Sequence, residues 1–135
     1  MKYFVDTSFW CALYNSRDEN NPRAMRLWET FVAAPVQLFT SEYVFDETVT
    51  IVKRRMDHRS AVELGTAILQ SRVVTIWEID HNICIDSWQL FKTHADKGFS
   101  FTDCTSFVLM RSYGLNQALS FDRHFTQMGF TVNTA

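Results

Sequence analysis

Four carboxylates stand at positions that a solvated surface role explains poorly: Asp6, Glu47, Asp103 and Asp122. Asp6 and Asp122 each directly follow an apolar run that predicts a buried strand, and parallel sheets place their ligands beyond the carboxyl ends of the strands. The two aspartates would lie side by side if those strands are neighbours. Asp103 falls in the first turn of a predicted helix, where a carboxylate is also common for capping alone.

Glu47 lies on the apolar face of its predicted helix. The residues at positions i, i+3, i+4 and i+7 of that face are Val44, Glu47, Thr48 and Ile51. Asp46 is about 100° away round the helix and can point to solvent. An ionised carboxylate on a buried face is unfavourable unless a cation pairs with it or a metal binds it. A basic partner would have to be Lys53 or Arg54, each well over a turn away, so ion pairing and a role in a site both stay open.

Four acids in one pocket would suit the hydrolysis of phosphodiesters with divalent metal ions. Mg²⁺ and Mn²⁺ prefer carboxylate and water oxygens, and metal pairs in such sites activate a water and stabilise the leaving oxygen. Without metal the acids repel one another, which raises some of their pKa values and destabilises the fold. We therefore expect all four acids to act as metal ligands and as catalytic residues.

The elements that must position these acids follow from the pattern of apolar residues. Apolar and β-branched runs predict strands at residues 2–5, 36–40, 73–77 and 118–121, with a last strand around 130–132. Helical periodicity predicts helices from Thr7 or Ser8 to Tyr14, from Asn21 to Pro35, from Ser41 to Met56, from Ser60, from Asp80, and from Ser100 to about Gly114. This alternation predicts a single α/β domain, residues 1–135, with a mostly parallel sheet.

Several of these helices carry capping signals at their starts. Asn21 before Pro22 is typical of an N-cap followed by the first helical residue, and Ser60 with Glu63 is typical of a capping box. Asp80 is expected to cap the next helix. The buried face predicted for that helix consists of Ile83, Cys84, Ser87, Trp88 and Phe91.

The overall composition is that of an ordinary globular domain. The chain has 135 residues, 47% of them hydrophobic and 21% charged, and its net charge of −2 argues against a strongly basic nucleic-acid footprint. Three cysteines, Cys11, Cys84 and Cys104, are far apart and are expected to be free thiols in a reducing compartment. No signal peptide or membrane span is predicted, so a cytoplasmic location is expected.

With these residues in view, the chain resembles PIN-domain proteins of the small type found as VapC toxin ribonucleases. Four segments carry the resemblance in order and spacing: residues 5–8 (VDTS), 41–47 (SEYVFDE), 100–104 (SFTDC) and 118–125 (ALSFDRHF). Two departures leave every acid in place. Cys104 stands where Ala is common in the family, and Ser120 stands where Thr is usual.

The resemblance implies a three-layer α/β/α fold with a central five-stranded sheet and a Mg²⁺- or Mn²⁺-dependent endoribonuclease that cleaves RNA. The family's acidic site would fall on Asp6, Glu47, Asp103 and Asp122, with Thr7 or Ser120 orienting a carboxylate or a bound water. The resemblance also implies a cognate antitoxin and a homodimer. On the first helix, Phe9, Trp10 and Tyr14 could form dimer surface, but core packing is the preferred interpretation.

Two other functions stay open at this stage. A haloacid-dehalogenase-type phosphatase also begins with a strand and an aspartate, but it needs a second aspartate where this chain has Ser8. A non-catalytic or RNA-processing PIN-like module would bind RNA or a protein partner without cleaving RNA. The residues that bind RNA are not identified by the sequence; the candidates for phosphate contact are Arg17, Lys53, Arg54, Arg55 and Arg123.

Overall fold

Five parallel strands form one sheet in the computed structural model, which describes residues 1–133. The strands are β1 (Lys2–Val5), β2 (Gln37–Ser41), β3 (Val74–Trp77), β4 (Gln117–Leu119) and β5 (Thr131–Asn133). Their spatial order is β3-β2-β1-β4-β5, and every neighbouring pair is parallel. The predicted central five-stranded sheet is therefore confirmed, and all of it is parallel.

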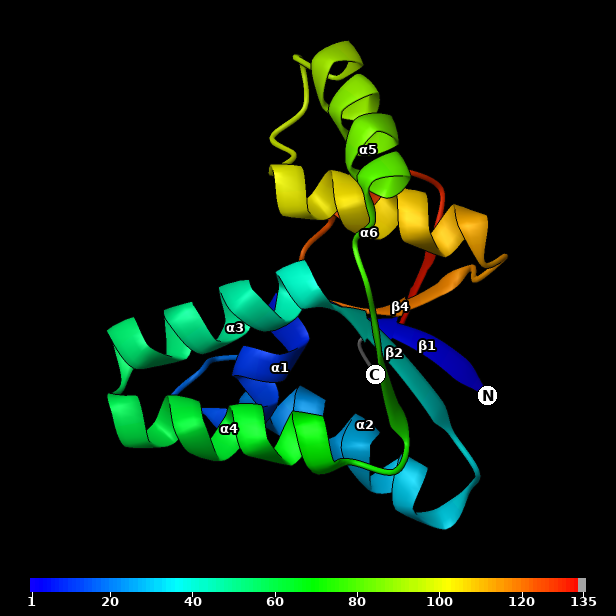
Figure 1. The fold of residues 1–135 in the computed structure, drawn as a ribbon. Helices are drawn as coiled ribbons and strands as arrows, with labels where there is room; N and C mark the ends of the chain where they lie inside the picture. Colours follow the sequence, from blue (N-terminus) through cyan, green and yellow to red (C-terminus); the bar gives the residue numbers. More distant parts are fainter. Residues whose placement is uncertain (134–135) are drawn as a thin grey trace.

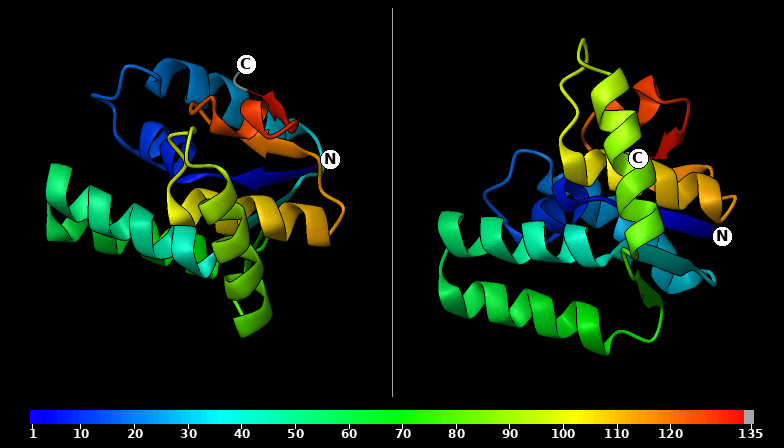
Figure 2. Two further views of the ribbon diagram at one scale, coloured as in Figure 1. Left: turned by 90° about the horizontal axis from the view of Figure 1, so that it is seen from above. Right: turned by 45° about the horizontal axis from the view of Figure 1, so that its top comes forward.

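In the described part of the chain, seven helices connect the strands: α1 (Thr7–Tyr14), α2 (Asn21–Ala33), α3 (Glu42–Arg55), α4 (His58–Gln70), α5 (His81–Thr93), α6 (Phe101–Ser112) and α7 (His124–Gln127). Figure 1 shows α1, α2 and α4 on one side of the sheet and α5 and α6 on the other, which is the predicted three-layer arrangement. The helices α3 and α4 run antiparallel and side by side, whereas α5 crosses α6 steeply (Figure 2). Within residues 1–133, no helix is long and apolar enough to cross a membrane.

The strand β1 lies in the middle of the sheet, with β2 on one side and β4 on the other. The chain runs outward from β1 through β2 to β3, and it then returns across the sheet to β4. The strand order therefore reverses between β1 and β4, and their registers place Val5 beside Leu119. In open parallel sheets such a switch point opens a crevice at the carboxyl ends of the strands. Asp6 and Asp122 both belong to the segments that leave this edge.

Aromatic side chains dominate the core on both sides of the sheet. Phe4, Phe9, Phe107 and Phe125 are all fully buried, and each contributes roughly 1.5–3 kcal/mol by leaving water. Phe107 and Phe125 pack edge to face with their centroids 5.1 Å apart. Since Phe9 and Trp10 are buried, the core interpretation of the first helix holds for both of them, and neither offers dimer surface. Tyr14 is half-buried and donates a hydrogen bond to Glu63 at 2.7 Å.

The predicted N-cap residues of three helices are wrong by one to three residues. Asp6 itself is the N-cap of α1, and Asn20 is the N-cap of α2. The helix α4 starts at His58 because the Asp57 carboxylate accepts a hydrogen bond from the Ser60 amide at 2.7 Å. Ser60 therefore lies inside the helix, and no Ser60–Glu63 capping box forms.

Of the other predictions about helices, two N-caps are right and one buried face is only partly right. Ser41 caps α3 and Asp80 caps α5, as predicted. The predicted buried face of α5 is only partly right, because Trp88 and Phe91 are 47% and 38% exposed. This helix packs mainly on α6 at a steep angle, so only a short part of its apolar face is covered.

The three cysteines are free thiols, as predicted. Cys11 and Cys104 are buried, and burial raises the pKa of each thiol to about 11. Because thiolates are the reactive form of cysteine, these two side chains act as small apolar core residues.

Candidate active site

Asp6 is held in place by the segments that follow β1 and β4. Its backbone amide donates to the Leu119 carbonyl at 3.1 Å, which continues the pairing of the two strands by one residue. The side chain is only 5% exposed. Two hydroxyls, those of Ser8 and Ser120, each donate to Asp6 Oδ2 at 2.9 Å. Ser120 and Ser8 thus both hold this carboxylate oxygen.

Thr7, the other residue predicted to orient a site group, makes a different contact. Its hydroxyl oxygen accepts a hydrogen bond from the Thr48 hydroxyl at 3.4 Å, which ties α1 to α3. Thr7 nevertheless lines the same cavity as the acids, and its backbone amide hydrogen-bonds to the Asp6 carboxylate.

Burial, and to a smaller extent the nearby charge of Asp103, raises the pKa of the Asp6 carboxyl from 3.8 to about 6. The hydrogen bonds from Ser120 and Ser8 favour the ionised form and offset only part of this effect. Asp6 is therefore an acid whose charge the surrounding protein stabilises poorly, although its geometry is well fixed. A bound cation would remove this penalty.

Asp103 serves the start of α6 and the cavity at the same time. Its amide donates to Ser100 Oγ at 3.0 Å, and its Oδ2 accepts from the Ser100 amide at 3.0 Å, so the two residues form a capping box. Capping fixes the carboxylate at the helix start, where the positive end of the helix dipole favours negative charge. The capping interpretation and the site interpretation are thus compatible for this residue.

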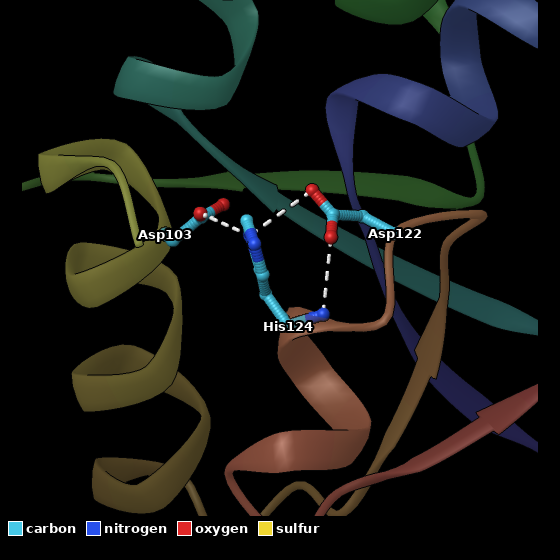
Figure 3. Close-up of side chains that lie close together, drawn as sticks. All are labelled: Asp103, Asp122 and His124. Carbon is cyan, nitrogen blue, oxygen red and sulfur yellow. Dashed lines mark hydrogen bonds and ion pairs between the residues drawn. The ribbon is translucent and has the colours of Figure 1, made fainter. Parts of the chain in front are cut away.

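Asp122 lies in the turn after β4, three residues beyond the end of the strand rather than directly after it. The Asp122 amide donates to Ser120 Oγ at 2.9 Å, and Asp122 Oδ1 accepts from the His124 amide at 3.0 Å. The His124 ring points between two carboxylates (Figure 3): its Nδ1 lies 2.8 Å from Asp103 Oδ2 and 3.1 Å from Asp122 Oδ2. One imidazole nitrogen therefore joins the acid of α6 to the acid of the β4 turn.

Glu47 approaches the same space from α3. The helix buries Val44, Thr48 and Val52 and exposes Asp46, which leaves Glu47 half-buried at the edge of the packed face. Among residues 1–133 no hydrogen bond or ion pair involves the Glu47 carboxylate. Ion pairing, the alternative explanation for this glutamate, is therefore not observed.

A cavity of about 590 Å³ brings all four predicted acids together. Its other lining residues include Ser8, Asp18, Asn20, Arg55, Arg123 and His124. Of the five basic residues considered for phosphate contact, Arg55 and Arg123 are on this wall. Asp18 is half-buried there and accepts a hydrogen bond from the Asn20 amide at 2.8 Å. Five acids thus face two arginines, and this cluster can hold a divalent cation.

Sequence reasoning did not assign a site role to Ser8, His124 or Asp18. Ser8 and His124 each follow a site acid by two residues, which is the one signal that could have singled them out. Asp18 sits in a polar loop with no periodicity, so nothing in the sequence separates it from a solvated acid.

The fold and this cavity together define an α/β domain with an acidic centre at the switch point of a parallel sheet. The chain belongs to the PIN-domain family, whose model matches residues 3–131. It is 39% identical over 127 residues, 94% of both chains, to the 23S rRNA-specific endonuclease VapC20 of Mycobacterium tuberculosis. The predicted resemblance to VapC-like PIN domains is therefore confirmed.

Solved structures agree with this assignment. The crystal structure of Mycobacterium tuberculosis VapC20, described as a sarcin–ricin loop cleaving toxin, superposes with a TM-score of 0.88 at 38% identity over 96% of both chains. VapBC2 from Rickettsia felis, bound to promoter DNA, gives 0.72 at 12% identity over 98% of both chains. FitAcB from Neisseria gonorrhoeae gives 0.68 at 18% identity, covering 98% of this chain and 96% of the other. The last two similarities support the fold alone.

Proposed function

We propose that this protein is a divalent-metal-dependent endoribonuclease that hydrolyses RNA phosphodiester bonds and acts as the toxin of a toxin–antitoxin pair. The observation that carries the proposal is the convergence of Asp6, Glu47, Asp103 and Asp122 from four separate segments on one cavity. The similarity to VapC20 over nearly the whole chain supports the reaction class and makes 23S rRNA the first substrate to test.

The donor set fits Mg²⁺ or Mn²⁺. Both ions favour carboxylate oxygens, and the Glu47 carboxylate has no partner within residues 1–133 that would compete with an ion. Bound there, such ions supply an activated water and stabilise the charge that develops on the phosphate. The proposed ligands are Asp6, Glu47, Asp103 and Asp122.

The chain itself contributes positioning and charge. Ser8 and Ser120 fix one oxygen of Asp6, whose side chain lines the cavity. The Ser100 capping box fixes Asp103 in the same way. Arg55 and Arg123 line the wall of the otherwise acidic cavity, and guanidinium groups suit the phosphates that flank a scissile bond. We assign the phosphate contacts to these two arginines.

The proposal is tested by incubating the metal-free protein with 23S rRNA, as intact ribosomes and as naked RNA, with Mg²⁺, with Mn²⁺ or with EDTA. Cleavage should require one of the metals, and Asp6→Asn should reduce its rate by at least roughly 100-fold because it removes a metal ligand. Asp46→Asn is the matched control, since this acid is exposed and adjoins Glu47. Equal cleavage by wild type and Asp6→Asn would refute the assignment of the site.

The binding-module alternative makes a different prediction for the same protein. A module whose acids serve only structure would gain no stability from Mn²⁺, whereas a metal site gains stability by mass action. A calorimetric Mn²⁺ titration without heat, together with an unchanged melting temperature, would favour the alternative. The phosphatase alternative is set aside, because Ser8 donates a hydrogen bond to Asp6 and stands where that chemistry needs an acid.

Partners are part of the same proposal. An apolar hollow of about 180 Å³ lies between α1, α2 and α4 and is lined by aromatic and aliphatic side chains, among them Trp10, Trp28 and Leu64. We assign this hollow to an apolar segment of a cognate antitoxin, since relatives of this fold are solved as VapBC complexes. Growth arrest on expression should be relieved by the antitoxin and restored by Ala67→Glu, which changes an exposed residue at the wall of the hollow, provided that this variant still cleaves RNA.

For the homodimer, the exposed aromatic face of α5 is the candidate surface. Trp88 and Phe91 stack with their ring centroids 5.8 Å apart while remaining 47% and 38% exposed. Light scattering should give twice the monomer mass for wild type, and Trp88→Glu should shift it toward the monomer. A wild type that stays monomeric at micromolar concentration would contradict the dimer.

A further inference from the structure

We propose that His124 is a metal ligand, which binds one cation through Nδ1 together with Asp103 and Asp122. The inference rests on the proposed metal dependence and goes beyond it. A nitrogen donor makes this position favour Mn²⁺ and other transition-metal ions over Mg²⁺.

The spacing of the three side chains is that of ligands around one ion. Octahedral ligands at about 2.1–2.2 Å from a cation lie about 3 Å apart along each edge of the octahedron. The distances from His124 Nδ1 are 2.8 Å to Asp103 Oδ2 and 3.1 Å to Asp122 Oδ2. One ligand atom from each residue can be chosen so that all three lie within 4.8 Å of one another. A cation can therefore be bound between these three side chains with little movement of them (Figure 3).

The ring is held in this orientation from several sides. Its backbone amide donates to Asp122 Oδ1 at 3.0 Å, which ties the first residue of α7 to the ligand beside it. The Phe99 ring packs edge to face on the imidazole with a centroid distance of 5.3 Å. Gly98 lies beside the ring, since a Cβ at this position would be in van der Waals contact with His124 Nε2 at 3.5 Å. The imidazole is thus preorganised with Nδ1 toward the acids, as metal-binding histidines usually are.

The donor type decides which ion this position prefers. Mg²⁺ binds oxygen donors and gives up its waters reluctantly. Imidazole suits transition-metal ions, whose affinity for nitrogen rises along the first row. Removing the imidazole should therefore weaken Mn²⁺ binding and leave Mg²⁺ binding nearly unchanged. If His124 only hydrogen-bonded the two carboxylates, its loss would affect both ions to a similar extent.

Electron spin-echo spectroscopy of bound Mn²⁺ tests the proposal without reference to activity. The metal-free full-length protein is loaded with substoichiometric Mn²⁺ as wild type, His124→Gln and His94→Gln. His94 is the matched control, because it is also half-buried and packs on Phe99 but does not line the cavity. Directly coordinated ¹⁴N should modulate the echo in wild type and His94→Gln and be absent in His124→Gln. Calorimetry should show Mn²⁺ affinity falling about 10–100-fold in His124→Gln and Mg²⁺ affinity falling less than about threefold.

Each other outcome overturns the inference. Mn²⁺ bound to wild type without nitrogen coupling refutes His124 as a ligand but leaves the proposed function standing. Equal loss of affinity for both ions in His124→Gln does the same. A wild type that binds no Mn²⁺ refutes both the inference and the metal-dependent function. The wild-type spectrum alone decides the question if His124→Gln fails to fold.

Discussion

Replacing Asp6 by Asn should change how the stability of the metal-free protein depends on pH. Burial and the charge of Asp103 raise the pKa of Asp6 from 3.8 to about 6 in the folded state. Between these two values the folded protein holds a proton that the unfolded chain has lost, so stability falls as pH rises. The contribution of Asp6 is fully present below about pH 4 and is lost as pH rises through about 6. Because Asn cannot ionise, the Asp6→Asn variant does not lose this contribution to stability as pH rises.

The size of the effect follows from the shift. Two pKa units correspond to about 3 kcal/mol at pH 8, where both states are ionised, and to about half of that at pH 5. No discount for solvent screening applies, because Asp6 is only 5% exposed. The amide oxygen of Asn can still accept from Ser8 and Ser120, so the variant should be the more stable protein at pH 8. Its advantage over wild type should grow by roughly 1–2 kcal/mol from pH 5 to pH 8.

Urea unfolding at pH 5, 6, 7 and 8 in the presence of EDTA measures this advantage directly. Any cost of fitting the amide is the same at every pH, so the widening of the difference isolates the carboxyl group. Asp46→Asn, an exposed acid on α3, should show a difference from wild type that does not vary with pH. A stability difference between Asp6→Asn and wild type that stays constant or narrows from pH 5 to pH 8 would refute the reasoning.

Three further predictions concern the same site and its support. Mn²⁺ at about 100 times its dissociation constant should stabilise wild type by about 2.7 kcal/mol at neutral pH, measured by thermal unfolding, and Asp6→Asn should gain less. Ser100→Ala removes the capping box of α6 and should cost about 1 kcal/mol of stability, and it should also weaken Mn²⁺ binding in calorimetry because Asp103 loses its anchor. Leu38→Ala empties a fully buried position on β2 and should cost about 2–5 kcal/mol in urea unfolding. Mn²⁺ affinity should be unchanged in Leu38→Ala, which would show that its lower stability comes from the core and not from the metal site.

The fold was predictable where one signal dominates locally. The strands around Phe4, Leu38 and Ile76 are short apolar or β-branched runs, and their type follows from composition alone. The start of α4 was not, because Asp57 and Ser60 are both good caps and only their competition in three dimensions selects Asp57. The exposure of Trp88 was missed for a related reason. Periodicity reveals an apolar face but not how much of it a crossing helix covers.

In the candidate site, too, local patterns predicted some residues and not others. Glu47 could be predicted because an acid on an apolar stripe contradicts its surroundings, and Asp6 could because it ends a strand. The role of Ser8 depends on β1 lying beside β4, which joins residues more than a hundred positions apart. The role of His124 depends on the turn after β4 meeting the start of α6. No local pattern contains that information. The resemblance to PIN domains supplied the acids from such distant segments, together with Ser120, but it assigned no role to Ser8 or His124.

The charges around the four acids distinguish a cluster with a purely structural role from a cation-binding site. Within residues 1–133, none of Asp6, Glu47, Asp103 and Asp122 forms an ion pair with Lys or Arg, and the one basic side chain that Asp103 and Asp122 contact is His124. An acid that serves structure alone is usually paired with a fixed cation when it is buried. Here serine hydroxyls and backbone amides fix the geometry of Asp6 and Asp103 without supplying a positive charge, and burial together with the charge of Asp103 raises the pKa of Asp6. The fold therefore keeps several carboxylates without a positive partner at the switch point between β1 and β4. Their mutual repulsion favours the binding of a cation from solution.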